Sequence, residues 1–230
     1  MKAMILAAGK GERMRPLTLT TPKPLLQAGG KALIDYHLER LARAGFQDLV
    51  INHAWLGEQV EQHVETHTPA GLGIQYSREG EPLETAGGLR KALPLLTEGG
   101  DWFALVNGDV WTDFDFARLT PPASGDALLV LIDNPSHNQQ GDFGLAADGR
   151  VTVAGDTHYT YAGIALIHRH LIEAAPPTED RLGPILKAAA AEGRVWGLIH
   201  PGAWIDVGTP DRLQALDRQL SEQKKESNIR

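Results

Sequence analysis

The strongest constraint on the fold is a glycine-rich turn that directly follows an apolar run at the N-terminus. Residues 1–8 read MKAMILAA, a nearly continuous apolar segment of the kind found in strands buried on both faces. Gly9-Lys10-Gly11 follows at once. Because glycine has no Cβ, such a turn lets the backbone come close to a ligand. The pattern predicts an α/β fold with a binding loop after its first strand.

Strand-like and helix-like segments then alternate through the first 110 residues. Apolar runs at 48–53, 73–77 and 101–109 predict strands. Segments 32–45 and 55–67 predict helices, and a third helix begins near residue 87, where Pro94 is expected to interrupt or close it. This alternation is typical of βαβ units and predicts a mostly parallel sheet.

The second half has a different pattern. Segments 126–132, 158–168, 194–200 and 203–208 predict strands, residues 143–154 predict a hairpin, and residues 181–193 predict a helix. Gly163 inside a strand indicates a bulge or a close approach. Thr209-Pro210 predicts the start of a last helix. We expect one domain over residues 1–220, followed by a polar, frayed tail at 221–230.

Composition narrows the class of protein. The 230 residues contain no cysteine, which excludes disulfides and thiolate metal sites. The net charge of −7 argues against broad nucleic-acid binding, which needs a basic surface. No signal-peptide pattern is present, and no apolar stretch approaches the roughly 18 residues of a membrane span. A cytoplasmic enzyme that binds neither membrane nor nucleic acid is the expectation.

Cations cluster around the glycine turn. Arg13 and Arg15 follow the glycines, and Lys23 stands between two prolines that stiffen its backbone. Fixed cations beside backbone N–H groups suit a polyphosphate. The loop is not a P-loop, because no Gly-Lys-Ser/Thr follows, and Met14 occupies the place of the third glycine of a dinucleotide fingerprint. A dehydrogenase is therefore disfavoured.

Two carboxylates are candidate metal ligands. Asp109 ends a predicted central strand in Asn107-Gly108-Asp109, and Asp206 ends a late strand. Ligands of open α/β sheets bind beside the carboxyl ends of strands. Two carboxylates together with phosphate oxygens suit Mg²⁺. Farther along, Thr85 is a candidate helix cap beside two glycines that would allow another close approach of the backbone.

These motifs, in this order, resemble the sugar-1-phosphate nucleotidyltransferases. The family's Gly-x-Gly-x-Arg loop and Pro-Lys-Pro segment correspond to residues 9–13 and 22–24, and segments 107–109, 161–163 and 204–210 also match. The resemblance covers nearly the whole chain. It implies a Rossmann-like, mostly parallel mixed sheet flanked by helices, the GT-A-like nucleotidyltransferase fold. It also implies formation of a nucleoside-diphosphate sugar and pyrophosphate from a nucleoside triphosphate and a sugar 1-phosphate.

The resemblance further implies roles for individual residues. Arg13 and Lys23 would be catalytic, and Asp109 and Asp206 would hold Mg²⁺. A nucleotide-binding half at about 1–110 would precede a sugar-binding half at about 111–210. The implied nucleotide contacts are Ala8, Gly9, Gly11, Glu12, Arg13, Lys23, Thr85 and Gly88. The implied sugar contacts are Asn107, Gly144, Asp156 and Tyr161.

Substrate choice within the family rests on finer similarities. The segments NHAWLGEQVE, LETAGG and NGDVWTDFDF most resemble members that act on UTP and N-acetylmuramate α-1-phosphate in cell-wall recycling. Members that use GTP and mannose 1-phosphate are the alternative, and a non-catalytic nucleotide-sugar sensor is a third hypothesis. We expect a monomer or a small homo-oligomer. Tyr161 stands where some N-acetylhexosamine enzymes have asparagine, and Thr157 where several relatives have lysine.

Overall fold

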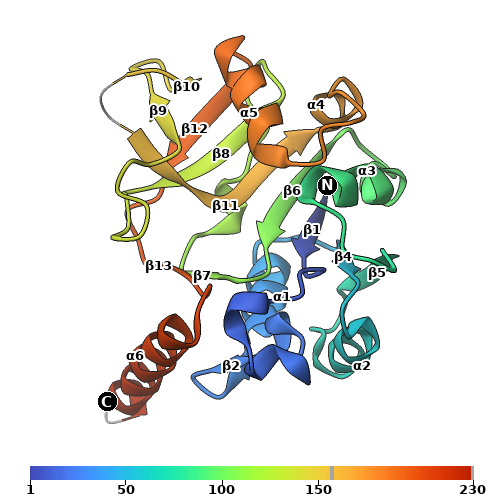
Figure 1. Cartoon of the computed structure of the whole chain (residues 1–230), viewed down its shortest axis with the longest axis vertical. Helices are drawn as coiled ribbons and strands as arrows, with labels where there is room; N and C mark the ends of the chain where they lie inside the picture. Colours follow the sequence, from blue (N-terminus) through green and yellow to red (C-terminus); the bar gives the residue numbers. More distant parts are fainter. Residues whose placement is uncertain (156–157, 229–230) are drawn as a thin grey trace.

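A mixed β-sheet forms the centre of the protein, and helices cover both of its faces (Figure 1). The structure, a computed structural model, describes residues 1–155 and 158–228. Within these residues nine strands form the main sheet, and two further pairs of short strands lie beside it. The fold is the α/β arrangement predicted from the sequence.

Most elements lie where the alternating pattern predicts them. The strands are β1 (Lys2–Leu6), β2 (Gln27–Ala28), β3 (Lys31–Ala32), β4 (Asp48–His53), β5 (Gly73–Arg78), β6 (Trp102–Asn107), β7 (Val110–Thr112), β8 (Ala127–Ile132), β9 (Phe143–Leu145), β10 (Val151–Thr152), β11 (His158–His168), β12 (Val195–Ile199) and β13 (Trp204–Asp206). The α-helices are α1 (Leu33–Arg43), α2 (Gly57–His67), α3 (Thr85–Leu96), α4 (Arg169–Glu173), α5 (Leu182–Ala191) and α6 (Pro210–Asn228).

The parallel part of the sheet brings three strand ends to one edge. β1 lies between β4 and β6 and runs parallel to both. In this register Leu6 is opposite Asn52 on one side and Asn107 on the other. The loops that follow β1, β4 and β6 therefore start side by side, at the carboxyl edge where ligands of such sheets bind.

Successive residues of the central strands point to opposite faces of the sheet and pack into two separate hydrophobic cores. Ile5 and Ile51 face the apolar sides of α1 and α2, whereas Met4 and Val50 face α3, α4 and α5. All four side chains are fully buried. A strand buried on both faces needs a nearly continuous apolar sequence, which explains the apolar runs at residues 3–8 and 49–51.

The second half extends the sheet with antiparallel strands. β11 pairs with β6, β8 and β9, and β12 runs parallel to β8 at the far edge. The register of β11 against β8 shifts between Tyr161 and Ala165. Gly163 lies within this shift at φ +71°, a conformation that favours glycine. The bulge predicted at Gly163 is thus confirmed.

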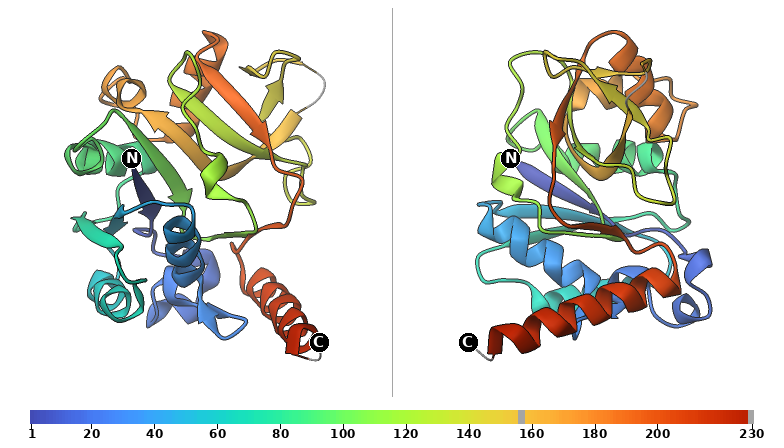
Figure 2. Two further views of the ribbon diagram at one scale, coloured as in Figure 1. Left: turned by 180° about the vertical axis from the view of Figure 1, so that it is seen from behind. Right: turned by 90° about the vertical axis from the view of Figure 1, so that its left-hand side faces the viewer.

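The C-terminal helix crosses back to the N-terminal half, where it contacts β2 (Figures 1 and 2). Its leucines 213, 216 and 220 pack against Met14, Ala28 and Trp111. Segment 221–230, predicted as a frayed tail, is helical through Asn228. The Lys224 ammonium donates to the carbonyl of Gly29, which attaches this last part of α6 to the domain.

Two local predictions in α3 are wrong. Pro94 does not interrupt the helix, which continues to Leu96 and ends with the Thr97 amide donating to the Leu93 carbonyl at 3.0 Å. Thr85 is the first helical residue rather than the cap, a position that Glu84 occupies. No helix in the described residues is both long and apolar enough to cross a membrane.

Candidate active site

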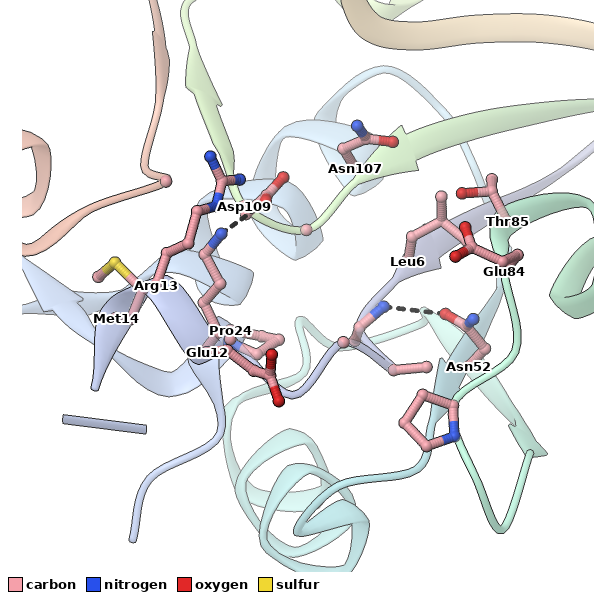
Figure 3. Close-up of a pocket in the computed structure, with 18 of the residues that line it drawn as sticks. Leu6, Glu12, Arg13, Met14, Pro24, Asn52, Glu84, Thr85, Asn107 and Asp109 are labelled. Carbon is pink, nitrogen blue, oxygen red and sulfur yellow. Dashed lines mark hydrogen bonds and ion pairs between the residues drawn. The ribbon is translucent and has the colours of Figure 1, made fainter. Parts of the chain in front are cut away.

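The glycine loop is shaped by the residue that stands in place of a third glycine. Residues 12–14 form a short 3₁₀ turn in which Met14 is fully buried against the leucines of α6. Gly11 precedes this turn at φ +62°, and a Cβ there would lie 2.8 Å from the Thr18 methyl group. With Met14 anchored inward, Arg13 projects into the pocket (Figure 3).

Backbone N–H groups of this loop are left without acceptors. The Ala7 amide donates to Asn52 Oδ1 at 2.9 Å, but the amides of residues 8–11 have no acceptor in the described part of the chain. Consecutive unpaired amides after a strand form an anion-binding concavity. This arrangement agrees with the predicted phosphate contacts at Ala8, Gly9 and Gly11.

Lys23 and Asp109 form an ion pair at the centre of the site. Lys23 Nζ lies 2.6 Å from Asp109 Oδ2, and the lysine side chain is 12% exposed. Pro22 and Pro24 are both buried, so the backbone that carries Lys23 is held on either side. Arg13 lies close to this pair and makes no ion pair of its own within the described residues (Figure 3).

A pocket of about 530 Å³ connects these groups. In Figure 3, Arg13 and Asp109 lie on one side, whereas Leu6, Glu84 and Thr85 lie on the other. Lys23 is on the side of Asp109, with which it pairs. Of the predicted nucleotide contacts, the lining includes Ala8, Gly9, Gly11, Glu12, Arg13, Lys23 and Thr85. The lining also includes Asn107 and Asp109. The structure therefore brings most of the predicted nucleotide contacts together in one pocket.

Two predicted candidates do not line this pocket. Gly88 lies near the start of α3, where a Cβ would stand 2.7 Å from Glu79 Oε1, so its small size also makes room for this carboxylate. Arg15 is exposed and pairs with the Glu12 carboxylate at 3.3 Å. The Glu12 carboxylate points away from Arg13 and Asp109 (Figure 3).

Asn52 is a lining residue that the sequence interpretation missed. It ends β4 at the edge shared with β1 and β6, and it is buried. Its Oδ1 accepts from the Ala7 amide, and its Nδ2 donates to Glu79 Oε1 at 2.6 Å. Asn52 thus fixes the start of the glycine loop. Its place after an apolar strand, parallel to the first, is the signal that could have identified it.

Asp206 lies beside Asp109 but does not line the pocket. The antiparallel pair of β13 and β7 places Asp206 opposite Val110, and the Val207 amide donates to the Asp109 carbonyl at 2.8 Å. The Asp206 carboxylate accepts from Arg212 at 2.5 Å. Gly208, two residues farther along, does line the pocket.

These two carboxylates suit a cation that also takes ligands from its substrate. Within the described residues no group of three or more histidine, aspartate or glutamate side chains could hold a metal. Mg²⁺ typically takes one or two protein carboxylates, substrate phosphates and water, all hard oxygen donors. Asp109, in the turn between β6 and β7, and Asp206, at the end of β13, fit that donor set.

A second pocket of about 360 Å³ adjoins the first. The two pockets share Glu84, Thr85 and Asn107, so a ligand can extend from one to the other. Tyr161 lines the second pocket, whereas Gly144 does not, although its neighbour Phe143 does. Asp156, also predicted to contact the sugar, lies outside the described residues.

Gly163 leaves the space that Asn107 occupies. A Cβ at Gly163 would lie 2.6 Å from Asn107 Nδ2, closer than real Cβ contacts allow. The bulge in β11 therefore serves the site, because it lets the Asn107 side chain stand at the border of the two pockets.

Solved structures with the same fold support this architecture. A structure described as that of a glucose-1-phosphate thymidylyltransferase from Bacillus anthracis, in complex with sucrose, superimposes with a TM-score of 0.82 at 20% identity. The superposition covers 96% of each chain. At this identity the likeness shows the fold.

Sequence relatives define the family. Residues 2–155 match the nucleotidyl transferase family. The N-acetylmuramate alpha-1-phosphate uridylyltransferase of Neisseria meningitidis serogroup B is 48% identical over 93% of this chain and 96% of its own. The protein of that name in Caulobacter vibrioides is 35% identical over 96% and 97%. A mannose-1-phosphate guanylyltransferase catalytic subunit beta of Dictyostelium discoideum is 30% identical over 97% and 66%. The chain belongs to the nucleotidyl transferase family.

Proposed function

We propose that this enzyme transfers the uridylyl group of UTP to N-acetylmuramate α-1-phosphate and releases pyrophosphate. The observation that carries the proposal is the convergence of Arg13, the Lys23–Asp109 pair and the unpaired loop amides on one pocket. The choice of UTP and N-acetylmuramate α-1-phosphate rests on the two relatives of that name, which match the chain nearly end to end.

The reaction needs positioning and charge neutralisation more than proton transfer. An oxygen of the sugar phosphate attacks the α-phosphorus of UTP in line, and the bond to the β-phosphate bridging oxygen breaks as pyrophosphate leaves. The attacking oxygen is already anionic, so no general base is required. Negative charge that develops on the leaving pyrophosphate is stabilised by Arg13 and the loop amides, while Lys23 holds the α-phosphate.

Asp109 and Asp206 are the residues that would hold Mg²⁺ in this proposal. The ion supplies charge neutralisation on phosphate oxygens when bound. Lys23 and Arg212 hold the two carboxylates in place through their ion pairs. Arg212 therefore acts as a positioning residue for Asp206, and Lys23 both positions Asp109 and contacts phosphate.

The sugar would enter from the second pocket. Asn107 at the shared border and Tyr161 deeper in are the described residues that would face it. We further propose that the enzyme acts in the cytoplasm, where UTP is made, and feeds peptidoglycan recycling. It would work as a monomer or small homo-oligomer.

The test is a matrix of four nucleoside triphosphates against several sugar 1-phosphates, with pyrophosphate release as the readout. The proposal expects the highest kcat/KM for UTP with N-acetylmuramate α-1-phosphate, and no release without a sugar phosphate. Preference for GTP with mannose 1-phosphate would favour the alternative suggested by the Dictyostelium relative. Binding of UTP with no turnover on any sugar phosphate would instead indicate a sensor.

A further inference from the structure

We propose that Lys187 in α5 binds the lactyl carboxylate of the sugar and thereby selects N-acetylmuramate over N-acetylglucosamine. This inference rests on the proposed function and assigns the group within the second pocket that reads the substrate's acidic substituent. Muramate differs from glucosamine by a lactyl ether, which adds one carboxylate and one methyl group. A residue that discriminates between them must therefore recognise an anion.

Helical spacing directs two turns of α5 at the second pocket. Leu182, Gly183, Leu186 and Lys187 all line it, and residues three and four apart share one face of a helix. Leu182 and Leu186 are buried, which fixes that face of the helix. Lys187 then stands at the pocket one turn beyond Gly183.

Lys187 is the pocket cation whose charge is not matched by a protein anion. Within the described residues it makes no hydrogen bond or ion pair. The other cation of the lining, Arg181, pairs with Glu179 at 3.2 Å. A ligand carboxylate would give Lys187 a charge-assisted partner.

The two carboxylates that line this pocket, Asp142 and Glu84, do not pair with the Lys187 ammonium. Asp142 accepts from the Tyr161 amide at 2.8 Å and from Asn138 Nδ2 at 3.2 Å. Glu84 is exposed and lies at the border with the nucleotide pocket. Neither carboxylate is within ion-pair distance of Lys187 in the described structure.

Tyr161 also lines the second pocket and carries a polar group. Its hydroxyl oxygen is buried and has no hydrogen-bond partner among the described residues. A buried hydroxyl without a partner lacks the hydrogen bonds that it would make in water, so such groups are rare in native proteins. Burial raises the pKa of the Tyr161 hydroxyl, which therefore stays protonated and able to donate.

Apolar side chains beside Lys187 suit the rest of the lactyl group. Phe143, Leu182 and Leu186 line the same pocket and are buried. They offer contact to a methyl group, whereas Lys187 offers contact to a carboxylate. The pocket thus presents both chemical features that distinguish a lactyl ether from a hydroxyl.

The test compares the binding of UDP-N-acetylmuramate and UDP-N-acetylglucosamine to the full chain by calorimetry. We expect the wild-type enzyme to bind the lactyl-bearing ligand at least about tenfold more tightly, and Lys187→Met to reduce that ratio at least about fivefold. Lys187→Arg, which keeps the charge, should restore most of the ratio. Lys91→Met is the matched control, since Lys91 is an exposed helical lysine outside both pockets.

Three results would overturn the inference. One is a wild-type enzyme with no preference for the lactyl group. Another is a Lys187→Met variant that keeps the wild-type ratio, and the third is a variant that loses affinity for both ligands equally. The substrate matrix tests the proposed function separately from this binding experiment. If the proposed function is wrong, the matrix shows no pyrophosphate release from UTP.

Discussion

Lys23 Nζ lies 2.6 Å from Asp109 Oδ2, which joins the segment after the glycine loop to the end of β6 across 86 residues of sequence. The pair makes one side of the nucleotide pocket before any ligand arrives. Each partner also has a proposed task of its own, since the ammonium contacts phosphate and the carboxylate holds Mg²⁺.

Loss of the Lys23 charge should abolish most activity. Lys23→Met keeps the side-chain length but removes the cation, so kcat/KM should fall at least about 100-fold. Steady-state pyrophosphate release measures this. Lys91→Met should stay within about threefold of wild type, because Lys91 lies outside both pockets. Near-normal activity in Lys23→Met would remove Lys23 from the mechanism.

Arg13 and Arg15 allow a second comparison of a pocket residue with a nearby control residue of the same type. Arg13 lines the pocket without an ion-pair partner in the described chain, whereas Arg15 is exposed and pairs with Glu12. Arg13→Met should lower kcat about 100-fold through lost charge stabilisation, and Arg15→Met should change it less than about threefold. Equal losses in the two variants would contradict the assigned orientation of the loop.

Substitution of Gly163 should disturb both stability and the site. Gly163→Ala places a Cβ 2.6 Å from Asn107 Nδ2 at φ +71°, and such strain costs on the order of 1–3 kcal/mol. Urea unfolding should report that loss. Gly100→Ala is the control, because its Cβ would meet nothing within 4 Å. Equal stability of the two variants would contradict this prediction, because it would show that the Asn107 side chain can move aside without loss of stability.

Acid should destabilise the fold through His37. This fully buried side chain in α1 has its pKa lowered to about 4 by burial, against 6.5 in the unfolded chain. The unfolded state therefore binds more protons between these values, and stability present at pH 7 is lost as the pH falls from about 6.5 to 4. The shift corresponds to roughly 3 kcal/mol.

Urea denaturation at several pH values checks the His37 prediction. In His37→Leu the slope of the unfolding free energy between pH 4 and 6.5 should become shallower, whereas His67→Gln, on the exposed end of α2, should keep the wild-type slope. An unchanged slope in His37→Leu would show that another group carries the acid sensitivity.

Local sequence signals predicted the features that depend on neighbouring residues. The buried strand before Gly9, the prolines around Lys23 and the lone glycine inside β11 each restrict their own backbone, so their consequences could be inferred directly. Thr85 and Pro94 show the limit of this reasoning. The exact start of α3 and its continuation past Pro94 depend on contacts that the local sequence does not contain.

Residues that act through tertiary placement were missed. Asn52 holds the loop because β4 pairs with β1 and places the Asn52 side chain beside Ala7. Lys187 reaches the second pocket because α5 packs along it, and its role there is the one proposed above. Neither residue belongs to a motif. Gly88 is a predicted nucleotide contact whose packing against the Glu79 carboxylate could not be inferred from its glycine doublet.

The central claim is that Arg13, Lys23 and a magnesium ion held by Asp109 and Asp206 converge on one UTP. A crystal structure with a non-hydrolysable UTP analogue and Mg²⁺ tests it most directly. The account predicts the triphosphate along the loop amides of residues 8–11, with Arg13 and Lys23 within hydrogen-bonding distance of its oxygens and density for an ion between the two aspartates. A triphosphate bound elsewhere, with both cations turned away from it, would contradict the account.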